Sequence, residues 1–169
     1  MKNYIGLGAT ALLLTACATV EPDGPSVIAT VRPASGSQVH GEVKFTQVGA
    51  RVRVSGEIAG LSPGAHGFHI HEKGDCSAPD GMSTGGHFNP QGKKHGAPNA
   101  PDRHAGDLGN LVAGEYGKAT LTMMIDGISV GKGVDGVIGR AVIVHANADD
   151  LKTDPTGNAG DRIGCGTIN

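Results

Sequence analysis

The sequence predicts an all-β domain, an eight-stranded antiparallel sandwich or barrel, and three observations point to this fold class. Glycine contributes 29 of the 169 residues, which argues against a bundle of long helices because glycine costs about 1 kcal/mol at a helix-interior position. Aromatic residues are few, with two Tyr, three Phe and no Trp. Short apolar or alternating runs recur between turns rich in Gly, Pro and Asp, which is typical of antiparallel sheets.

The strand pattern is clearest at Arg51–Ile58, where polar and apolar residues alternate with the period of a half-buried strand. In chain order, the predicted strands are Val27–Arg32, Val43–Gln47, Arg51–Ile58, Phe68–His71, Asn110–Ala113, Lys118–Ile125, Arg140–His145 and Cys165–Ile168. The long stretch Glu72–Gly109 shows little strand pattern. A loop of this length in a compact domain is usually functional or disordered, and its histidines indicate a function.

The N-terminus is typical of a targeting segment. Lys2 precedes an apolar stretch from Ile5 to Leu14, so residues 1–16 are predicted to be a signal peptide. The sequence Leu14-Thr-Ala-Cys17 resembles a bacterial lipobox, in which the cysteine is lipidated; the alternative is an ordinary signal peptide with an incidental Cys17. We expect a periplasmic protein anchored to a membrane through lipidated Cys17, with residues 17–25 as a flexible tether and 26–169 as one folded domain.

Net charge and cysteine content restrict the function further. The chain has 14 basic and 16 acidic residues, so a nucleic-acid role driven by a basic surface is unsupported. If Cys17 carries lipid, Cys76 and Cys165 remain as one pair, and an exported protein can keep a disulfide. Two free thiols or a cysteine metal site are the alternatives, although neither cysteine lies in a CxxC motif.

Histidines carry the strongest functional signal, because seven of the eight lie between His66 and His145. In a strand, residues i and i+2 point to the same face, so His69 and His71 are predicted to share one face while Ile70 faces the core. Two adjacent imidazoles pack poorly in a core but chelate a metal well. His66 falls on the opposite face and is interpreted as a structural histidine bonded to backbone. A further histidine, His40, is expected at the surface.

The long loop adds the pattern H-x7-H-x8-H-x2-D, formed by His87, His95, His104 and Asp107. Three neutral imidazoles and one carboxylate form a good tetrahedral zinc site, which would also order the loop. His145 ends a predicted strand and could join His69 and His71 as a further ligand. Sites rich in nitrogen and poor in carboxylates favour copper or zinc over calcium or magnesium.

Several motifs together resemble copper/zinc superoxide dismutase over residues 27–168. These motifs are Gly67-Phe-His-Ile-His-Glu72, Gly86-His-Phe-Asn-Pro90, Lys94-His-Gly96, Arg103-His-Ala-Gly-Asp-Leu-Gly109, Gly139-Arg140, His145-Ala-Asn-Ala-Asp-Asp-Leu151 and Gly157-Asn-Ala-Gly-Asp-Arg-Ile-Gly-Cys-Gly166. The resemblance implies an immunoglobulin-like Greek-key fold with long metal-binding loops and two resident metals, copper and zinc.

The resemblance also implies a role for each matched residue. The copper ligands would be His69, His71, His87 and His145. The zinc ligands would be His87, His95, His104 and Asp107, with the His87 imidazolate bridging both metals. Asp149 matches a carboxylate that links a copper and a zinc histidine, here His69 and His95. Arg162 matches an arginine that guides the anionic substrate, and Cys76 and Cys165 match an internal disulfide.

The implied activity is disproportionation of superoxide to oxygen and hydrogen peroxide, with copper cycling between Cu(II) and Cu(I) and His87 as proton carrier. The segment between His145 and Arg162 is shorter than in animal relatives, and Asp161 would weaken the attraction at Arg162. Lysines in the other loop, namely Lys73, Lys93 or Lys94, are candidates to compensate. The alternatives are an exported copper-binding or copper-storage module and a structural sandwich. The oligomeric state stays open between monomer and homodimer.

Overall fold

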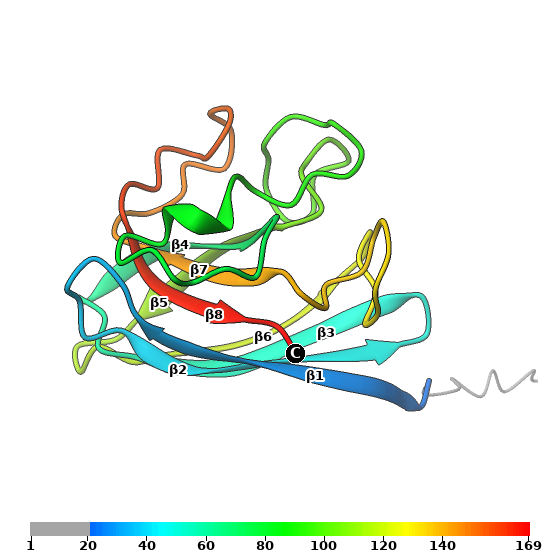
Figure 1. The fold of residues 1–169 in the computed structure, drawn as a ribbon, viewed down its shortest axis with the longest axis horizontal. Coiled ribbons are helices and arrows are strands. Elements are labelled where there is room, and N and C mark those ends of the chain that lie inside the picture. The colour runs from blue at the N-terminus through cyan, green and yellow to red at the C-terminus, as the bar shows by residue number, and fades with distance from the viewer. Residues whose placement is uncertain (1–20) are drawn as a thin grey trace, which may run out of the picture.

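The computed structural model describes residues 21–169, so the predicted signal peptide and the lipidation site at Cys17 lie outside the described residues. Eight antiparallel strands form one sheet that curls into a nearly closed barrel (Figure 1). The strands are β1 Asp23–Pro33, β2 His40–Val48, β3 Arg51–Ala59, β4 Gly64–His71, β5 Asp107–Ala113, β6 Ala119–Ile125, β7 Ala141–His145 and β8 Arg162–Thr167. The predicted all-β, eight-stranded fold is confirmed.

The strand order around the sheet is β5-β4-β7-β8-β1-β2-β3-β6. Three pairs of neighbours, β4–β7, β8–β1 and β3–β6, are not consecutive in the chain, so the chain crosses between the halves of the barrel as in a Greek key. β1 joins the halves, because Ser26–Val31 pair with β2 whereas Arg32 and Pro33 pair with β8. This topology places β4 beside β7, which in turn pairs with β8, although β4 is distant from both in sequence.

The barrel interior is apolar because inward positions alternate along the strands. In β3, Val52 and Val54 point inward and are fully buried, while Arg51, the first residue of the strand, is exposed. The largest fully buried side chains include Phe45, Phe68 and Ile70, which form one continuous core with the valines. This packed core makes the strands a rigid base for the loops.

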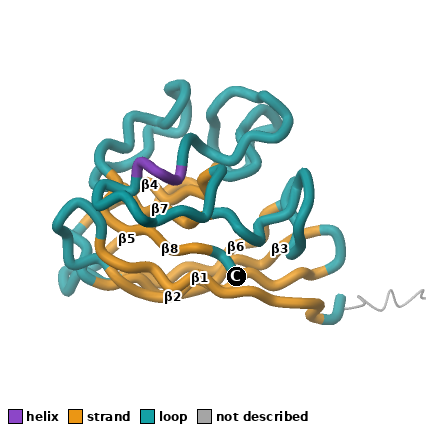
Figure 2. Tube along the Cα trace, viewed as in Figure 1, coloured by secondary structure: helices purple, strands orange, loops and turns teal. Residues whose placement is uncertain are grey.

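Long connections project from one side of the barrel (Figure 2), and they bring the histidine-rich stretch close to the segment between β7 and β8. The only helical element among residues 21–169 is the single 3₁₀ turn Met82–Thr84. Within this part of the chain, no helix has the length and apolar character needed to cross a membrane.

Several strand boundaries differ from the sequence-based expectation. β2 begins at His40 rather than Val43, and β4 begins at Gly64 rather than Phe68. β1 begins at Asp23, so residues 23–25 of the predicted tether are strand, with a shift in the register between Asp23 and Ser26 where Pro25 cannot donate a hydrogen bond. β5 begins at Asp107 rather than Asn110, because Asp107 pairs with His69. β8 begins at Arg162 rather than Cys165, because it continues pairing with β7 as far as His145. Long-range pairing set these ends.

Candidate metal centre

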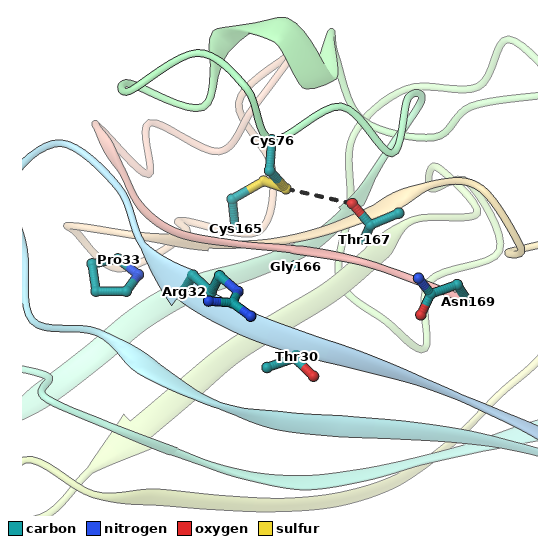
Figure 3. Close-up of a pocket in the computed structure, with 8 residues that line it drawn as sticks. All are labelled: Thr30, Arg32, Pro33, Cys76, Cys165, Gly166, Thr167 and Asn169. Atoms are coloured by element: carbon teal, nitrogen blue, oxygen red, sulfur yellow. Dashed lines mark hydrogen bonds between the residues drawn. A yellow bond between two sulfur atoms is a disulfide. The ribbon is translucent and has the colours of Figure 1, made fainter.

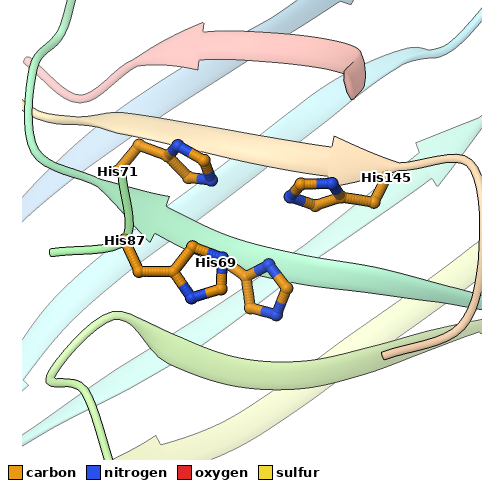
Figure 4. Close-up of side chains that lie close together, drawn as sticks. All are labelled: His69, His71, His87 and His145. Carbon is orange, nitrogen blue, oxygen red and sulfur yellow. The ribbon is translucent and has the colours of Figure 1, made fainter. Parts of the chain in front are cut away.

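Two clusters of metal-binding side chains share one histidine beside β4. In each cluster, the candidate ligand atoms all lie within 4.8 Å of one another, and every member is buried. The first cluster contains His69, His71, His87 and His145 (Figure 4). The second contains His87, His95, His104 and Asp107. The structure therefore gathers the two predicted ligand sets, and His87 is common to both.

Neighbouring strands position the first cluster. His69 and His71 lie on β4, with Ile70 between them in the core, as the strand period predicts. β7 pairs antiparallel with β4 and ends at His145, which brings the third ring to the same place. His87 comes from the long loop, and its backbone forms an isolated antiparallel β-bridge with His71. The ring centroids of His69 and His87 lie 4.0 Å apart, with the ring planes tilted by 32°.

Hydrogen bonds fix which nitrogen of each ring is free. The Nδ1 atoms of His71 and His145 lie 3.0 Å from the carbonyl oxygens of Gly85 and Gly160, so each Nδ1–H donates to a carbonyl. His69 uses its other nitrogen, because Nε2–H donates to an oxygen of Asp149 at 2.8 Å. These bonds leave the opposite nitrogen of each ring without a proton, and a neutral imidazole nitrogen of this kind is a metal ligand.

Four buried nitrogens have no hydrogen-bond partner among the described residues: His69 Nδ1, His71 Nε2, His87 Nε2 and His145 Nε2. Buried polar atoms are normally hydrogen-bonded, so four unpartnered acceptor nitrogens in one cluster indicate that a ligand binds there. A copper ion would satisfy all four, since imidazole nitrogen suits copper. The residues present therefore fit a copper ion bound by nitrogen alone.

The second cluster has the donor set and the spacing of a tetrahedral zinc site. The Nδ1 atoms of His87, His95 and His104 lie 2.9, 3.0 and 3.2 Å from Asp107 Oδ1, and the Nδ1 atoms of His87 and His104 are 3.4 Å apart. Zinc–ligand bonds of about 2.0–2.1 Å at tetrahedral angles place the ligand atoms about 3.3 Å from one another. The separations in this cluster are close to this value, so the residues fit a zinc ion.

Backbone and carboxylate contacts hold these ligands in place. The second oxygen of Asp107 accepts hydrogen bonds from the backbone N–H groups of Gly96 at 3.0 Å and His104 at 2.8 Å. Asp149 then connects the two clusters, because its oxygens accept from His69 Nε2 at 2.8 Å and His95 Nε2 at 2.9 Å. Asp149 occupies the linking position that the sequence resemblance implies. Partners of this kind orient the rings and select their tautomers.

Burial keeps the first cluster neutral. It lowers the pKa of His145 to about 3 and that of His87 to about 4, although Asp107 opposes the shift at His87. His95 behaves oppositely: burial lowers its pKa, but hydrogen bonds to Asp107 and Asp149 outweigh this effect and raise the pKa to about 10. Neutral imidazoles at physiological pH are ready to bind a metal without first losing a proton.

A cavity of about 260 Å³ opens beside His145 and contains Arg162. Its lining residues are Ser35, Asp80, Met82, His145, Thr156, Gly160, Asp161 and Arg162. Arg162 Nη1 donates to the Gly81 carbonyl at 3.0 Å and to Thr84 Oγ1 at 2.9 Å, which fixes the guanidinium. Burial lowers the pKa of Arg162, but an arginine stays protonated at any physiological pH.

Charges around this cavity bear on two sequence-based expectations. Asp161 lines the cavity, as its place in the chain suggests, and Asp80 adds a second carboxylate. The three lysines considered as compensating charges do not line it; Lys93 instead donates to the Pro101 carbonyl at 3.0 Å. Among residues 21–169, Arg162 is therefore the only lysine or arginine that lines this cavity.

Other sequence-based assignments are also settled by geometry. His66 is buried and its Nδ1 lies 2.9 Å from the His145 carbonyl, whereas His40 is exposed, so both expectations are confirmed. Cys76 and Cys165 form a disulfide with Cα atoms 5.9 Å apart. Sequence reasoning missed Thr84, which is fully buried and holds Arg162. A lone loop threonine offers no signal in the sequence.

Comparison with known proteins agrees with this geometry. Residues 39–168 match the family model described as copper/zinc superoxide dismutase. The chain belongs to the copper/zinc superoxide dismutase family. A crystal structure of the clock protein EA4 is also similar, with 43% sequence identity and a TM-score of 0.77 over 92% of this chain and 98% of that chain. Membership of this family and the two clusters together support binding of copper and zinc.

Proposed function

We propose that the protein disproportionates superoxide, converting two superoxide anions and two protons into oxygen and hydrogen peroxide. The observation that carries the proposal is the convergence of four unpartnered histidine nitrogens next to a cavity that contains a fixed arginine. Copper bound by these nitrogens supplies one-electron redox chemistry, whereas zinc, which has none, stabilises the loop that carries its ligands. Family membership supports the same activity.

Arg162 has the position and the charge to attract the substrate. Superoxide is an anion, while the chain has a formal charge of −2, so local charge must outweigh the overall field. Nη1 is fixed by Gly81 and Thr84, and the remaining guanidinium hydrogens make no hydrogen bond with residues 21–169. Those free donors can hold an anion beside His145, in competition with the Asp80 and Asp161 carboxylates that line the same cavity.

His87 is the residue suited to supply a proton. Its Nδ1 faces the second cluster at 2.9 Å from Asp107 Oδ1, while Nε2 faces the first cluster without a partner. A proton held at Nε2 therefore lies within the first cluster, where the reduced product forms. Proton delivery by a positioned imidazole needs this short reach to the reacting atoms.

The proposed test compares the metal-loaded protein with an Arg162→Ala variant and a matched Arg53→Ala variant. Arg53 lies on β3 and pairs with Asp23, outside the cavity, and both variants lose one positive charge. We expect superoxide decay with wild-type protein to slow as ionic strength rises and to fall about tenfold in Arg162→Ala but not in Arg53→Ala. Equal rates in wild type and Arg162→Ala would reject the guiding role.

The same preparation distinguishes the enzyme from a copper-binding or copper-storage module on this fold. Turnover that requires both metals supports the enzyme, whereas stoichiometric copper and zinc without superoxide turnover supports the storage function. Failure to bind either metal rejects both. This measurement matters because one fold can carry different functions in different relatives.

We also propose that the protein is exported and anchored by a lipid on Cys17. The motif Leu14-Thr-Ala-Cys17 and the apolar stretch before it support this location. A Cys76–Cys165 disulfide is compatible with an oxidising compartment. Mass spectrometry of the mature N-terminus is the test, and an unmodified Cys17 would contradict the anchor.

A further inference from the structure

A second cavity lies on the outer face of the barrel, over β1 and β8, and it contains the disulfide (Figure 3). Its volume is about 460 Å³, within the range of small-ligand sites. It does not include any residue of the two metal clusters. The cavity therefore needs an explanation independent of the metals.

The strand register places the positively charged side chain of Arg32 beside the disulfide. Arg32 on β1 pairs directly with Cys165 on β8, and directly paired residues of antiparallel strands point to the same face with Cβ atoms about 4.5–5.5 Å apart. Thr30 and Thr167 lie two residues further along each strand and so share this outward face. Cys76 comes from the loop after β4 and also lines the cavity, bonded to Cys165.

Among residues 21–169, Arg32 is the only charged side chain that lines this cavity. The cavity is also lined by Asn169, whose terminal carboxylate lies at the other end, where its backbone pairs with Ile28, four residues along β1 from Arg32. It is exposed, and its guanidinium makes no hydrogen bond or ion pair with any residue from 21 to 169. The carboxylate nearest in sequence to the disulfide, Asp75, accepts a hydrogen bond from the Ser77 backbone N–H at 2.9 Å and does not line the cavity. The end of the cavity beside the disulfide, where Arg32 pairs with Cys165, is therefore positive and favours an anion.

The two sulfurs differ in access. Cys165 is only 4% exposed, whereas Cys76 is half-buried. Thr167 Oγ1 lies 3.9 Å from Cys76 Sγ and donates its proton to the Gly74 carbonyl at 2.6 Å. An incoming nucleophile therefore reaches Cys76 more readily, and the sulfur that leaves is Cys165, beside the positive charge of Arg32.

We propose that this cavity is an entry site for small anionic thiols, which exchange with the Cys76–Cys165 disulfide there. The thiolate of the small molecule attacks Cys76 Sγ, a new disulfide forms between the two, and the electron pair of the broken bond goes to Cys165 as a thiolate. A second thiol then releases reduced Cys76 and leaves as a symmetrical small-molecule disulfide. Arg32 favours this exchange twice, because it attracts the anionic reagent and stabilises the departing Cys165 thiolate.

The size of the effect follows from one charge at short range. Coulomb's law in water, at a separation of about 6 Å, gives about a threefold gain for a reagent with one added negative charge. A reagent with one added positive charge loses about the same factor, so anionic and cationic thiols differ by about tenfold at low salt. Added salt reduces this difference.

The test measures disulfide reduction in the intact, metal-loaded protein. Three small thiols of similar size are compared: mercaptoethanesulfonate, which is anionic, 2-mercaptoethanol, which is neutral, and cysteamine, which is cationic. Free cysteines are trapped with an alkylating reagent and counted by mass spectrometry, and each rate is divided by the thiolate fraction of its reagent. Dividing each variant's rate by the wild-type rate with the same thiol removes differences in intrinsic reactivity.

Two variants with equal charge change separate the site from the general surface field. The quantity compared is the ratio of the reduction rate with the anionic thiol to that with the cationic thiol, which we call the anionic preference. In Arg32→Gln, this ratio is expected to fall about tenfold, while Arg32→Lys retains it. Arg53→Gln, on β3 outside the cavity, is expected to retain it as well. Equal preferences in wild type and Arg32→Gln, equal losses in Arg32→Gln and Arg53→Gln, or no reduction of wild-type protein by the anionic thiol would each overturn the proposal.

Discussion

Replacing Asp149 with asparagine isolates the contact that joins the two metal clusters. Asp149 has a fully buried side chain, and its two oxygens accept hydrogen bonds from His69 and His95. Asparagine has nearly the same shape but one oxygen and one NH₂ group. One ring N–H would then face another donor, so that ring must rotate, change tautomer or lose its partner.

The expected loss falls on both metals, because the two rings belong to different clusters. His69 presents its unpartnered Nδ1 to the first cluster, while His95 presents Nδ1 to the second, 3.0 Å from Asp107 Oδ1. Mutation of a carboxylate that orients a ligating histidine lowers metal affinity by about 10–100-fold, which corresponds to about 1.4–2.8 kcal/mol. Since asparagine can satisfy only one ring, we expect the two affinities to fall unequally.

Competition with chelators of known affinity measures copper and zinc separately in wild type and Asp149→Asn. The neighbouring Asp150→Asn is the control, because the Asp150 oxygens bond only within their own loop, to Lys152, Thr153 and Asn158. We expect Asp150→Asn to leave both affinities unchanged. Copper and zinc affinities of Asp149→Asn within twofold of wild type would refute the argument that Asp149 positions the rings.

Further outcomes follow from glycine geometry, from the disulfide and from the buried histidines. A Cβ on Gly157 would overlap Asp149 Oδ1, so Gly157→Ala should lose metal affinity as Asp149→Asn does. Gly92 has the same φ of 63° but no atom within 4 Å of an added Cβ, so Gly92→Ala should keep its metal affinity. Equal metal affinities in the two variants would contradict this steric argument. Replacing both Cys76 and Cys165 with alanine should lower the free energy of unfolding by about 4–5 kcal/mol, because the disulfide closes a loop between residues 89 positions apart. Denaturant titrations measure this loss, and a loss below about 1 kcal/mol would count against the chain-entropy argument. In metal-free protein, the folded-state pKa values of about 4 for His87 and about 3 for His145 lie below the usual 6.5, so the unfolded chain binds more protons between pH 6.5 and 4. The free energy of unfolding should therefore fall as pH drops through this window, by about 1.4 kcal/mol per pH unit for each histidine, and urea titrations that show no change would exclude the burial of neutral rings.

Local periodicity carried much of the prediction. The alternation in Arg51–Ile58 gave a strand whose observed range is Arg51–Ala59, and the i, i+2 spacing of His69 and His71 placed both rings on one face. These features depend only on the two-residue period of a strand, so the sequence contains them. The ligand sets came from residue chemistry and from resemblance to a family, and the structure gathers both sets.

Strand boundaries were less predictable because pairing with distant strands decides them. Asp107 became the first residue of β5 through its pairing with His69, and Arg162 became the first residue of β8 through its pairing with His145. Neither partner is near in sequence, so propensity and turn signals within the segment could not locate these ends. Side-chain burial and hydrogen bonds between distant residues were equally hard to predict. Thr84 is an example, because its contact with Arg162 joins two segments that are far apart in sequence.

The all-β class, the shared face of His69 and His71, and the residue types able to hold two metals all follow from the amino-acid sequence without a structure. Tertiary structure alone decided which ring nitrogens stay free, where Arg162 is fixed, and that Arg32 stands beside the disulfide. The physical reason is range: side-chain alternation is a property of a few consecutive residues, whereas tautomers, fixed charges and cavities depend on atoms that meet only when distant strands pair.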